Sequence, residues 1–308
     1  MHIAITGASG FIGSALGRHL EQRGHTVLRL RRGHEGDPGA HWDPRSGWIR
    51  DGLFDGVDAV VHLAGEDIGA GRWSGARRRE LRASRIVSTR LLVDHLGALQ
   101  QRPSAFVSAS AIGFYGDRGV ELLTEDAGPG NGFLAGLVYD WEAEAARAGD
   151  FAMRPVMLRF GLVLAKEGGV LPRLLLPFRL GIGGRLGSGR QWMSWVSRSD
   201  AVRAVEHVLA GDLAGPVNVT SPEPVTNREF TRALGRALRR PAIFPVPAFG
   251  LKVMFGPSRA RELFLFSQRV LPERLRASGF DFAYPELGPA LMHALGRNQE
   301  ASRVAPAV

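Results

Sequence analysis

The sequence predicts an α/β fold: a Rossmann-type, doubly wound parallel sheet with a small, mostly helical C-terminal cap domain. Two observations predict it. Short β-rich runs alternate with helical patterns from the first residues to about Gly215, which is typical of repeated βαβ units. A glycine-rich turn at 7–13 also follows the first such run and opens the first helical pattern, as it does in dinucleotide-binding folds.

The predicted strands are short apolar runs between turn or helix signals. They are 2–6, 26–30, 59–63, 105–108, 156–158 and 216–219. The first helix carries apolar pairs at 11–12 and 15–16 and stops at Gly24, a residue suited to the position after a helix. Two longer helical patterns cover about 76–99 and 133–148. We expect these helices to cover the sheet.

The pattern changes after residue 164, where a Leu/Pro-rich stretch leads into a glycine-rich segment at 181–189 that we interpret as a hairpin-like loop. A helix resumes at 200–209. Thr226 and Glu229 then have the spacing of a capping box, which marks the start of another helix. Residues 241–295 form a proline-punctuated set of short helical patterns, which predicts the cap domain.

Composition excludes several classes of protein. The chain of 308 residues has no cysteine, so disulfide frameworks, thiolate nucleophiles and Cys-ligated zinc are excluded. The nine histidines show no paired ligand spacing, and we expect no metal. No apolar run reaches the ~18 residues of a membrane span, and no targeting segment is visible. We therefore expect a cytoplasmic protein without a membrane partner.

The net charge of +9 comes almost entirely from arginine, because Lys166 and Lys252 are the two lysines among 39 basic residues. The arginines are scattered rather than gathered in a run with interleaved aromatic residues, so a nucleic-acid partner is not expected. A codon bias toward arginine accounts for the excess without any partner.

The turn at 7–13 predicts a dinucleotide site. Gly7 permits the tight turn, Gly10 lets the backbone approach a pyrophosphate, and Gly13 lets the helix lie close to the sheet. The helix N-terminus offers N–H groups to the phosphates. The residues expected to hold the cofactor here are Gly7, Ser9, Gly10, Phe11, Ile12 and Gly13. The run 63–65 ends a parallel strand, where crevice ligands bind, which adds Gly65 to them.

The end of the second strand decides which dinucleotide is expected. NAD enzymes place an acidic residue there, whereas this chain has Arg31 and Arg32 and no acid before Glu35. Two guanidinium groups suit a 2′-phosphate, so the sequence favours NADP(H). The alternative is that both belong to the general arginine excess.

The chain resembles the atypical branch of the extended short-chain dehydrogenase/reductase superfamily. More narrowly, it is similar to the epimerase family protein group (NAD-dependent epimerase/dehydratase-like), which carries a family-specific C-terminal domain. The similarity spans nearly the whole chain and depends on the motifs at 6–13, 63–66, 71–73, 84–85, 108–116, 141–142, 176–181 and 284–288. The resemblance implies NADP(H) contacts from Arg31, Arg32, Leu63, Ala64, Glu80, Arg85 and Leu162.

With the cofactor included, we expect an NADP-binding Rossmann domain at 1–164 plus 196–220. A substrate or cap domain is expected at 165–195 plus 221–296, and a flexible tail at 297–308. Members of the superfamily commonly form a dimer through their two long helices, so a homodimer is a possible assembly of this chain.

The usual catalytic pair of this superfamily, Tyr-x-x-x-Lys, is missing. Four residues after Tyr115, Tyr139 and Tyr284 stand Gly119, Ala143 and Gly288. When Glu142 is matched to the glutamate that often follows the motif, the two positions fall on Leu134 and Val138, neither of which moves a proton. The remaining candidates for catalysis are Ser110 and Tyr115, which would hold a substrate oxygen. His62 lies in an apolar strand and is expected to be a buried, hydrogen-bonded histidine.

Three functions stay open. The leading prediction is an NADP(H)-dependent oxidoreductase that acts on an unknown small molecule. The second is an NADP(H)-binding protein without turnover that acts as a redox-sensing or regulatory partner. The third is a sugar-nucleotide epimerase, which needs the same missing proton shuttle. Trp192 and Trp195 are expected to belong to the core, since spaced aromatic residues are more often buried there, and a wall of the substrate pocket is the alternative.

Overall fold

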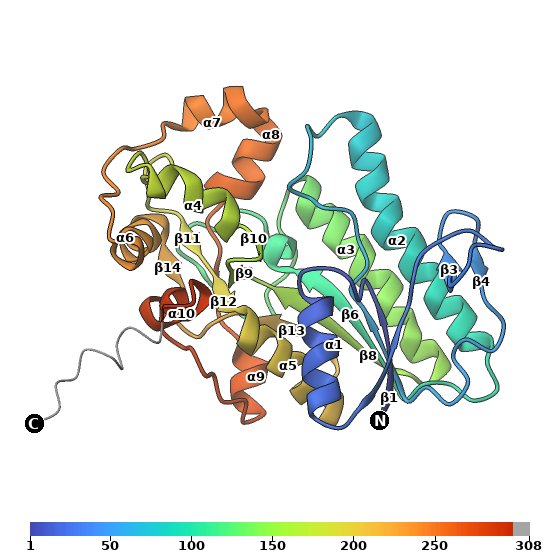
Figure 1. The fold of residues 1–308 in the computed structure, drawn as a ribbon. Helices are drawn as coiled ribbons and strands as arrows, with labels where there is room; N and C mark the ends of the chain where they lie inside the picture. Colours follow the sequence, from blue (N-terminus) through green and yellow to red (C-terminus); the bar gives the residue numbers. More distant parts are fainter. Residues whose placement is uncertain (298–308) are drawn as a thin grey trace, which may run out of the picture. The chain divides into compact units, whose positions relative to one another are not determined.

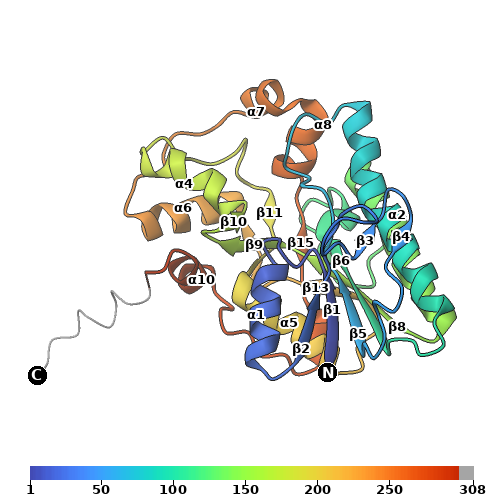
Figure 2. The ribbon, with the colours of Figure 1, turned by 45° about the vertical axis from the view of Figure 1, so that its right-hand side comes forward.

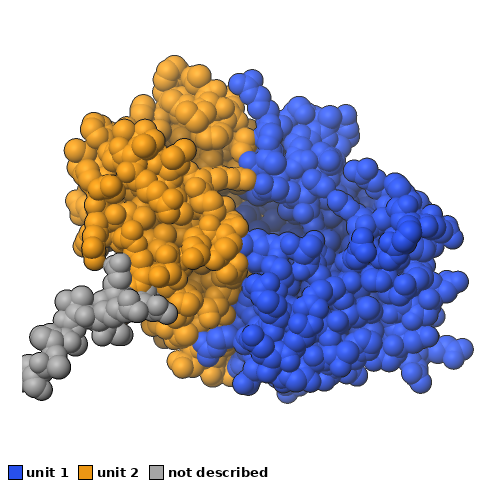
Figure 3. All heavy atoms as spheres, viewed as in Figure 1, with its two compact units in different colours: residues 1–114, 131–159, 202–217 blue, residues 115–130, 160–201, 218–308 orange. Residues whose placement is uncertain are grey.

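A computed structural model describes residues 1–297, so the tail expected at 297–308 lies, from residue 298 onward, outside the described residues. The chain divides into two compact units (Figure 3). Unit 1 comprises 1–114, 131–159 and 202–217, and unit 2 comprises the remaining segments, 115–130, 160–201 and 218 onward. The division differs from the expected domains in that 115–130, 160–164, 196–201 and 218–220 group with the C-terminal part.

Unit 1 is built on the predicted sheet, and each predicted strand is present. Its strands are β1 (His2–Thr6), β2 (Thr26–Arg29), β5 (Ala59–His62), β6 (Ala105–Ala111), β8 (Arg154–Phe160) and β13 (Gly215–Val219). Their order in the sheet is β13-β8-β6-β5-β1-β2 (Figure 1). β1 pairs in parallel with β2 on one side and with β5 on the other. The chain therefore reverses its direction across the sheet at β1, which is where doubly wound folds bind ligands.

The helices of unit 1 lie where the sequence predicts them. They are α1 (Gly13–Gln22), α2 (Gly75–Ala98), α3 (Phe133–Ala146), α5 (Arg198–Ala210), and the 3₁₀ turns η1 (Ile112–Tyr115) and η2 (Arg147–Phe151). α2 and α3 lie side by side, and α1 lies next to α5, where His19 Nε2 is 2.6 Å from Glu206 Oε2 (Figures 1 and 2). The elements η1, β8, α5 and β13 pass from one unit into the other.

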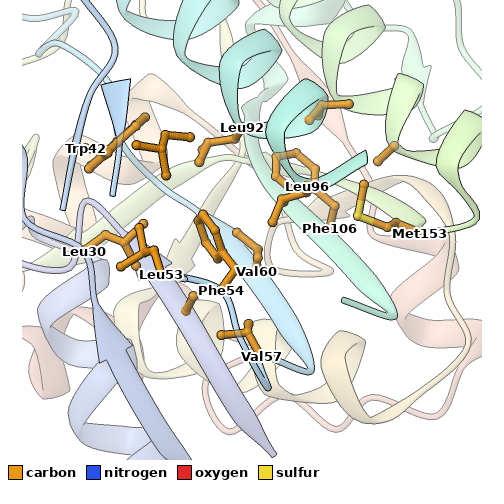
Figure 4. Packing of buried hydrophobic residues seen from close by; sticks show 14 of the residues in the cluster. Leu30, Trp42, Leu53, Phe54, Val57, Val60, Leu92, Leu96, Phe106 and Met153 are labelled. Carbon is orange, nitrogen blue, oxygen red and sulfur yellow. The ribbon is translucent and has the colours of Figure 1, made fainter. Parts of the chain in front are cut away.

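Apolar side chains from α2, α3 and the sheet form the core of unit 1. Val60 and Phe106 of the central strands pack with Leu92 and Leu96 of α2 (Figure 4). Trp42 joins this core from a small antiparallel hairpin, β3 (Trp42–Asp43) with β4 (Trp48–Ile49). The sequence did not predict this hairpin, because two-residue strands are too short for an alternating pattern.

Unit 2 combines short strands with helices. Its elements are β7 (Leu122–Leu123), β9 (Leu162–Ala165), β10 (Gly168–Gly169), α4 (Leu171–Arg179), β11 (Trp192–Met193), β12 (Trp195–Ser197), β14 (Val225–Thr226), α6 (Asn227–Leu238), α7 (Ala248–Phe255), α8 (Pro257–Ala260), the π turn η3 (Arg261–Leu265), β15 (Arg269–Val270), α9 (Glu273–Ala277) and α10 (Leu287–Ala294). The helices α4, α6 and α10 pack around Trp195, and this packing forms a second core.

Two local predictions for unit 2 have different outcomes. The capping box is confirmed: Thr226 Oγ1 accepts from the Glu229 N–H, and Glu229 Oε2 accepts from the Thr226 N–H at 2.7 Å. The hairpin-like interpretation of 181–189 is wrong. That segment forms no hairpin of its own, because Leu186 bridges to Val246 near the start of α7.

Candidate nucleotide-binding and active site

The glycine turn between β1 and α1 requires its glycines. Gly7 has a φ of +65°, and a Cβ there would lie 2.8 Å from the backbone carbon of Leu63. A Cβ at Gly13 would overlap the carbonyl oxygen of Gly7. The Gly10 N–H closes the turn by donating to Gly7 O at 2.9 Å. The chain is therefore folded back on itself, with Ser9 and Gly10 exposed on the outside of the turn.

The start of α1 fits an anionic group. Ile12 occupies the N-cap position, no side chain of residues 1–297 caps this helix end, and its first turn contains no acidic residue. Helix N-termini carry unsatisfied N–H groups and a partial positive charge. A pyrophosphate at this turn would supply the missing acceptors, so the glycine cradle and the uncapped helix fit the predicted dinucleotide.

The carboxyl end of β5 lies directly against this turn. Thr6 Oγ1, at the end of β1, accepts hydrogen bonds from the N–H groups of Leu63 at 3.2 Å and Ala64 at 3.3 Å. Gly65 follows them, and its Cα faces the guanidinium of Arg85. The structure thus brings 7–13 and 63–65 together at the point where the sheet reverses, as expected for parallel strands that end at one edge.

The two arginines expected to select the nucleotide differ in their contacts. Both are exposed. Arg32 Nη1 lies 3.8 Å from Glu66 Oε1, so this guanidinium reaches the loop after β5. The Arg31 backbone N–H donates to His41 Nδ1 at 3.0 Å. Burial, followed by the nearby Arg50, lowers the pKa of His41, which favours the neutral ring that accepts this bond.

Glu66 is the centre of a charged cluster that includes, besides Arg32, the predicted residues Glu80 and Arg85. Arg85 Nη2 donates to the Glu66 carbonyl at 2.9 Å, and its guanidinium lies over the Trp141 ring. Burial lowers the pKa of Arg85 to about 10. Glu80 pairs with Arg77 Nη1 at 2.6 Å, and the same atom is 3.4 Å from Glu66 Oε2. Sequence reasoning missed Arg77, although its i,i+3 spacing to Glu80 is a visible signal.

Leu162 stands apart from the other predicted cofactor residues. It begins β9 in unit 2, where its N–H donates to Ser194 O at 2.9 Å. Its nucleotide contact stays a prediction.

Ser110 belongs to a buried ionic cluster. Its hydroxyl donates to Glu142 Oε1 at 2.5 Å. The same carboxylate accepts two hydrogen bonds from Arg159, from Nε at 2.8 Å and from Nη2 at 2.7 Å. The Arg159 guanidinium also lies 3.6 Å from the centre of the Phe114 ring. Because the hydroxyl hydrogen points to Glu142, Ser110 Oγ can accept a hydrogen bond from a ligand but not donate one.

Tyr115 has different partners. Its side chain is fully buried, and its hydroxyl donates to Asn218 Oδ1 at 2.8 Å. The Asn218 N–H donates to Glu125 Oε1 at 3.0 Å, and its amide NH₂ to the Leu271 carbonyl at 2.9 Å. This network ties η1 to segments far away in the sequence. In the structure the Tyr115 hydroxyl therefore makes a structural hydrogen bond, and its catalytic role stays a prediction.

Two further predictions concern packing. Leu134 and Val138 of α3 stand against Gly113, where a Cβ would lie 3.5 Å from Leu134 Cβ and 3.9 Å from Val138 Cγ2. His62 is fully buried, with Nδ1 2.7 Å from Thr6 Oγ1 and Nε2 3.3 Å from Ser88 Oγ. The buried, hydrogen-bonded histidine is confirmed. Burial lowers its pKa to about 3.

Trp192 and Trp195, for which the sequence favours the core over a pocket wall, have separate environments. Trp195 is fully buried in the core of unit 2, and its indole N–H donates to the Glu223 carbonyl at 3.0 Å. Trp192 is half-buried, with the Arg269 guanidinium over its ring. Within residues 1–297, no group of three or more His, Asp or Glu side chains is arranged to hold a metal ion. In the same part of the chain, every helix is too short or too polar to cross a membrane.

Known proteins share both parts of this architecture. The model of the NAD dependent epimerase/dehydratase family matches residues 3–220, and that of a domain of unknown function, DUF1731, matches 246–294. The epimerase family protein Mb2239 of Mycobacterium bovis is 43% identical over 297 residues, which cover 96% of this chain and 98% of the relative.

Two solved structures extend the similarity. The crystal structure of human epimerase family protein SDR39U1 (isoform 2) with NADPH has a TM-score of 0.87 and 35% identity, and the match covers 96% of this chain and 99% of that one. A nucleoside-diphosphate sugar epimerase from Corynebacterium glutamicum has a TM-score of 0.78 and 32% identity, and the match covers 98% of this chain and 60% of that one. The chain thus belongs to the NAD dependent epimerase/dehydratase family.

Proposed function

We propose that the protein binds NADP(H) in preference to NAD(H) and is an oxidoreductase that acts on a small molecule. One observation carries the nucleotide preference: two exposed arginines, Arg31 and Arg32, follow β2, and Arg32 reaches the loop after β5. The human relative crystallised with NADPH, 35% identical, supports the same choice.

The charges around this strand end explain how the preference would arise. A 2′-phosphate offers oxyanions that match the planar guanidinium fork. It would compete with Glu66 for Arg32, across a separation of 3.8 Å that is long for a strong ion pair. A ribose 2′-hydroxyl has no charge and makes no such contact, so NADH would lose this interaction.

The residues near the reacting groups have defined tasks in this proposal. When bound, the nicotinamide would supply or accept a hydride. Ser110 would orient the substrate by accepting a hydrogen bond from it, while Glu142 and Arg159 keep the serine rotamer fixed. A role for Tyr115 at the substrate oxygen would require its bond to Asn218 to break.

A titration of the full chain, followed by nicotinamide fluorescence, tests the nucleotide preference. We expect NADPH to bind at least about 10-fold more tightly than NADH. A hydrogen bond to a charged group contributes about 1.5–3 kcal/mol, and about 1.4 kcal/mol corresponds to a tenfold change in affinity. Arg31→Ala combined with Arg32→Ala should remove the difference. The double variant Arg18→Ala with Arg23→Ala is the control, since it removes two exposed charges from α1 and from the position directly after it. Equal affinities for both nucleotides in the wild type would refute the preference.

A nucleotide-binding protein without turnover is the second candidate, and Leu134 and Val138 at the Tyr and Lys positions favour it. A panel of quinones, aldehydes and ketones with NADPH, followed by nicotinamide absorbance, separates the two. Sugar nucleotides test the epimerase alternative, which the relative from Corynebacterium glutamicum suggests; their products are analysed for the epimer, because an epimerase regenerates its nicotinamide and leaves the absorbance unchanged. Binding of NADPH with neither consumption nor an epimer across the panel would favour the second candidate.

A further inference from the structure

Among the described residues, Arg269, at the start of β15 in unit 2, is an arginine without a counter-ion. Its side chain is half-buried, and its buried Nε has no hydrogen-bond acceptor in that part of the chain. Within residues 1–297 its guanidinium makes no ion pair, and its one described side-chain interaction is with the Trp192 ring, whose centre is 4.2 Å from Cζ.

Arg77, Arg78 and Arg259 also have a buried Nε without an acceptor among the described residues, but each of them has further partners, such as the Glu80 carboxylate on Arg77 Nη1. Other buried or half-buried arginines have full sets of acceptors. Arg159 has two hydrogen bonds to Glu142. Arg154 donates to the carbonyl oxygens of Leu213 and Val208. A buried donor without an acceptor loses its hydration and receives nothing in return. The contrast indicates that Arg269 is kept for an acceptor that comes from outside the chain.

The backbone around Arg269 is fixed on both sides. The Val270 N–H donates to Ser194 Oγ at 2.8 Å, and Ser194 Oγ donates to the Gln268 carbonyl at 2.9 Å. β15 also pairs in parallel with β7, and this pairing places Arg269 opposite Leu122.

The ring beneath the guanidinium is fixed by the same segment. The Trp192 N–H donates to Ser267 Oγ at 3.0 Å, and its carbonyl accepts from the Gln268 N–H at 3.1 Å. The Arg269 guanidinium and the Trp192 ring are therefore both held in place by residues 267–269. A stacked guanidinium keeps its edge donors available in one plane, the geometry that binds an oxyanion through two parallel hydrogen bonds.

We propose that Arg269, held flat on Trp192, binds a carboxylate or phosphate group of the protein's small-molecule ligand. The site itself is independent of the nucleotide, and only the identification of that ligand as the substrate depends on the proposed function. The substrate class would accordingly be an anionic small molecule.

Nuclear magnetic resonance of the full chain tests this site without a known substrate. The protein has six tryptophans, so its indole N–H signals are few, and the signal that Trp192→Phe removes is that of Trp192. Inorganic phosphate, glutarate and chloride are titrated separately at constant ionic strength and without nucleotide. We expect the Trp192 signal to shift and saturate with phosphate or glutarate but not with chloride. The anion that saturates it at the lower concentration shows whether the ligand group is a phosphate or a carboxylate.

Variants distinguish this site from general attraction of anions. Arg269→Gln should weaken binding at least about 10-fold, and Arg269→Lys should recover part of it because the charge stays while the fork is lost. Four arginines, Arg232, Arg236, Arg239 and Arg240, line a separate cavity at the end of α6. The variant Arg239→Ala with Arg240→Ala is the matched control and should leave the titration unchanged.

Several results would overturn the assignment. They are a Trp192 signal that no oxyanion shifts, an equal shift in Arg269→Gln, and loss of the shift in the α6 control alone. NADPH titrations of the same samples report the nucleotide site separately. Saturation by phosphate in a protein that fails to bind NADPH would refute the proposed function and leave the Arg269 site standing.

Discussion

The hydroxyl of Ser110 donates to the carboxylate of Glu142, and both side chains are buried. The same carboxylate neutralises Arg159, of which 3% is exposed. A candidate catalytic serine therefore depends on an ion pair that water does not reach. Its geometry and the stability of unit 1 are linked.

Replacing Glu142 by glutamine should destabilise the protein by about 3–5 kcal/mol, because it leaves the Arg159 charge buried and uncompensated. Urea unfolding followed by circular dichroism measures the change. Asp140→Asn is the control, since it removes the exposed pair with Arg82 and should cost less than about 1 kcal/mol. Exchanging Glu142 and Arg159 together for methionine should recover part of the loss. Glu142→Gln with wild-type stability would contradict this account.

Replacing Tyr115 by phenylalanine should cost about 1–3 kcal/mol, because the buried Oδ1 of Asn218 loses its donor. Thermal unfolding measures it. Tyr139→Phe provides the matched control, since Tyr139 is 55% exposed and its variant should stay within about 0.5 kcal/mol. A purely catalytic Tyr115 would instead leave stability intact and reduce turnover.

His62 should make the protein less stable as the pH falls below about 6.5. Its pKa in the folded protein is about 3, so between these values the unfolded chain binds a proton that the folded protein does not. The free energy of unfolding should then decrease by up to about 1.4 kcal/mol per pH unit. Above about pH 7 the ring is neutral in both states, and the effect should vanish.

Urea unfolding of the wild type and His62→Gln between about pH 4.5 and 7.5 isolates this contribution. The variant removes the titration, so its stability should fall less steeply with decreasing pH. The two curves should run parallel above about pH 7. Equal slopes throughout the range would show that His62 is not responsible.

Gly13→Ala should abolish measurable NADPH binding, because the added Cβ would overlap the Gly7 carbonyl and push the turn open. Fluorescence titration measures the loss, and circular dichroism checks that the fold remains. If Gly13→Ala binds NADPH normally, the turn does not hold the nucleotide.

Gly136→Ala should stabilise the protein by about 0.5–1 kcal/mol, because alanine is the better helix former. Gly136 lies on the exposed side of α3, and a Cβ there meets no atom within 4 Å among the described residues. Thermal unfolding measures the gain, and NADPH affinity should not change. A lower melting temperature would indicate a contact at this position that the structure does not describe.

The fold was predictable because its signals are local. The alternation of β-rich runs and helical patterns located each strand of the six-stranded sheet, and the spacing of Thr226 and Glu229 located the start of α6. Likewise, the glycines at 7–13 predicted the turn. A position with a positive φ or a close backbone contact favours glycine, because glycine has no Cβ. Pairs such as β3 with β4 and β7 with β15 were missed because two residues carry no periodicity.

The sequence by itself determined that a glycine turn and two arginines follow the first two strands, because these features lie within single βα units. Only the tertiary structure decided that Ser110 donates to Glu142, that Tyr115 donates to Asn218, and that Arg269 lies on Trp192. These partners are 32, 103 and 77 positions apart in the chain. Hydrogen bonds and ring contacts of this kind depend on distances that chain folding sets, and no local pattern of residue types encodes them.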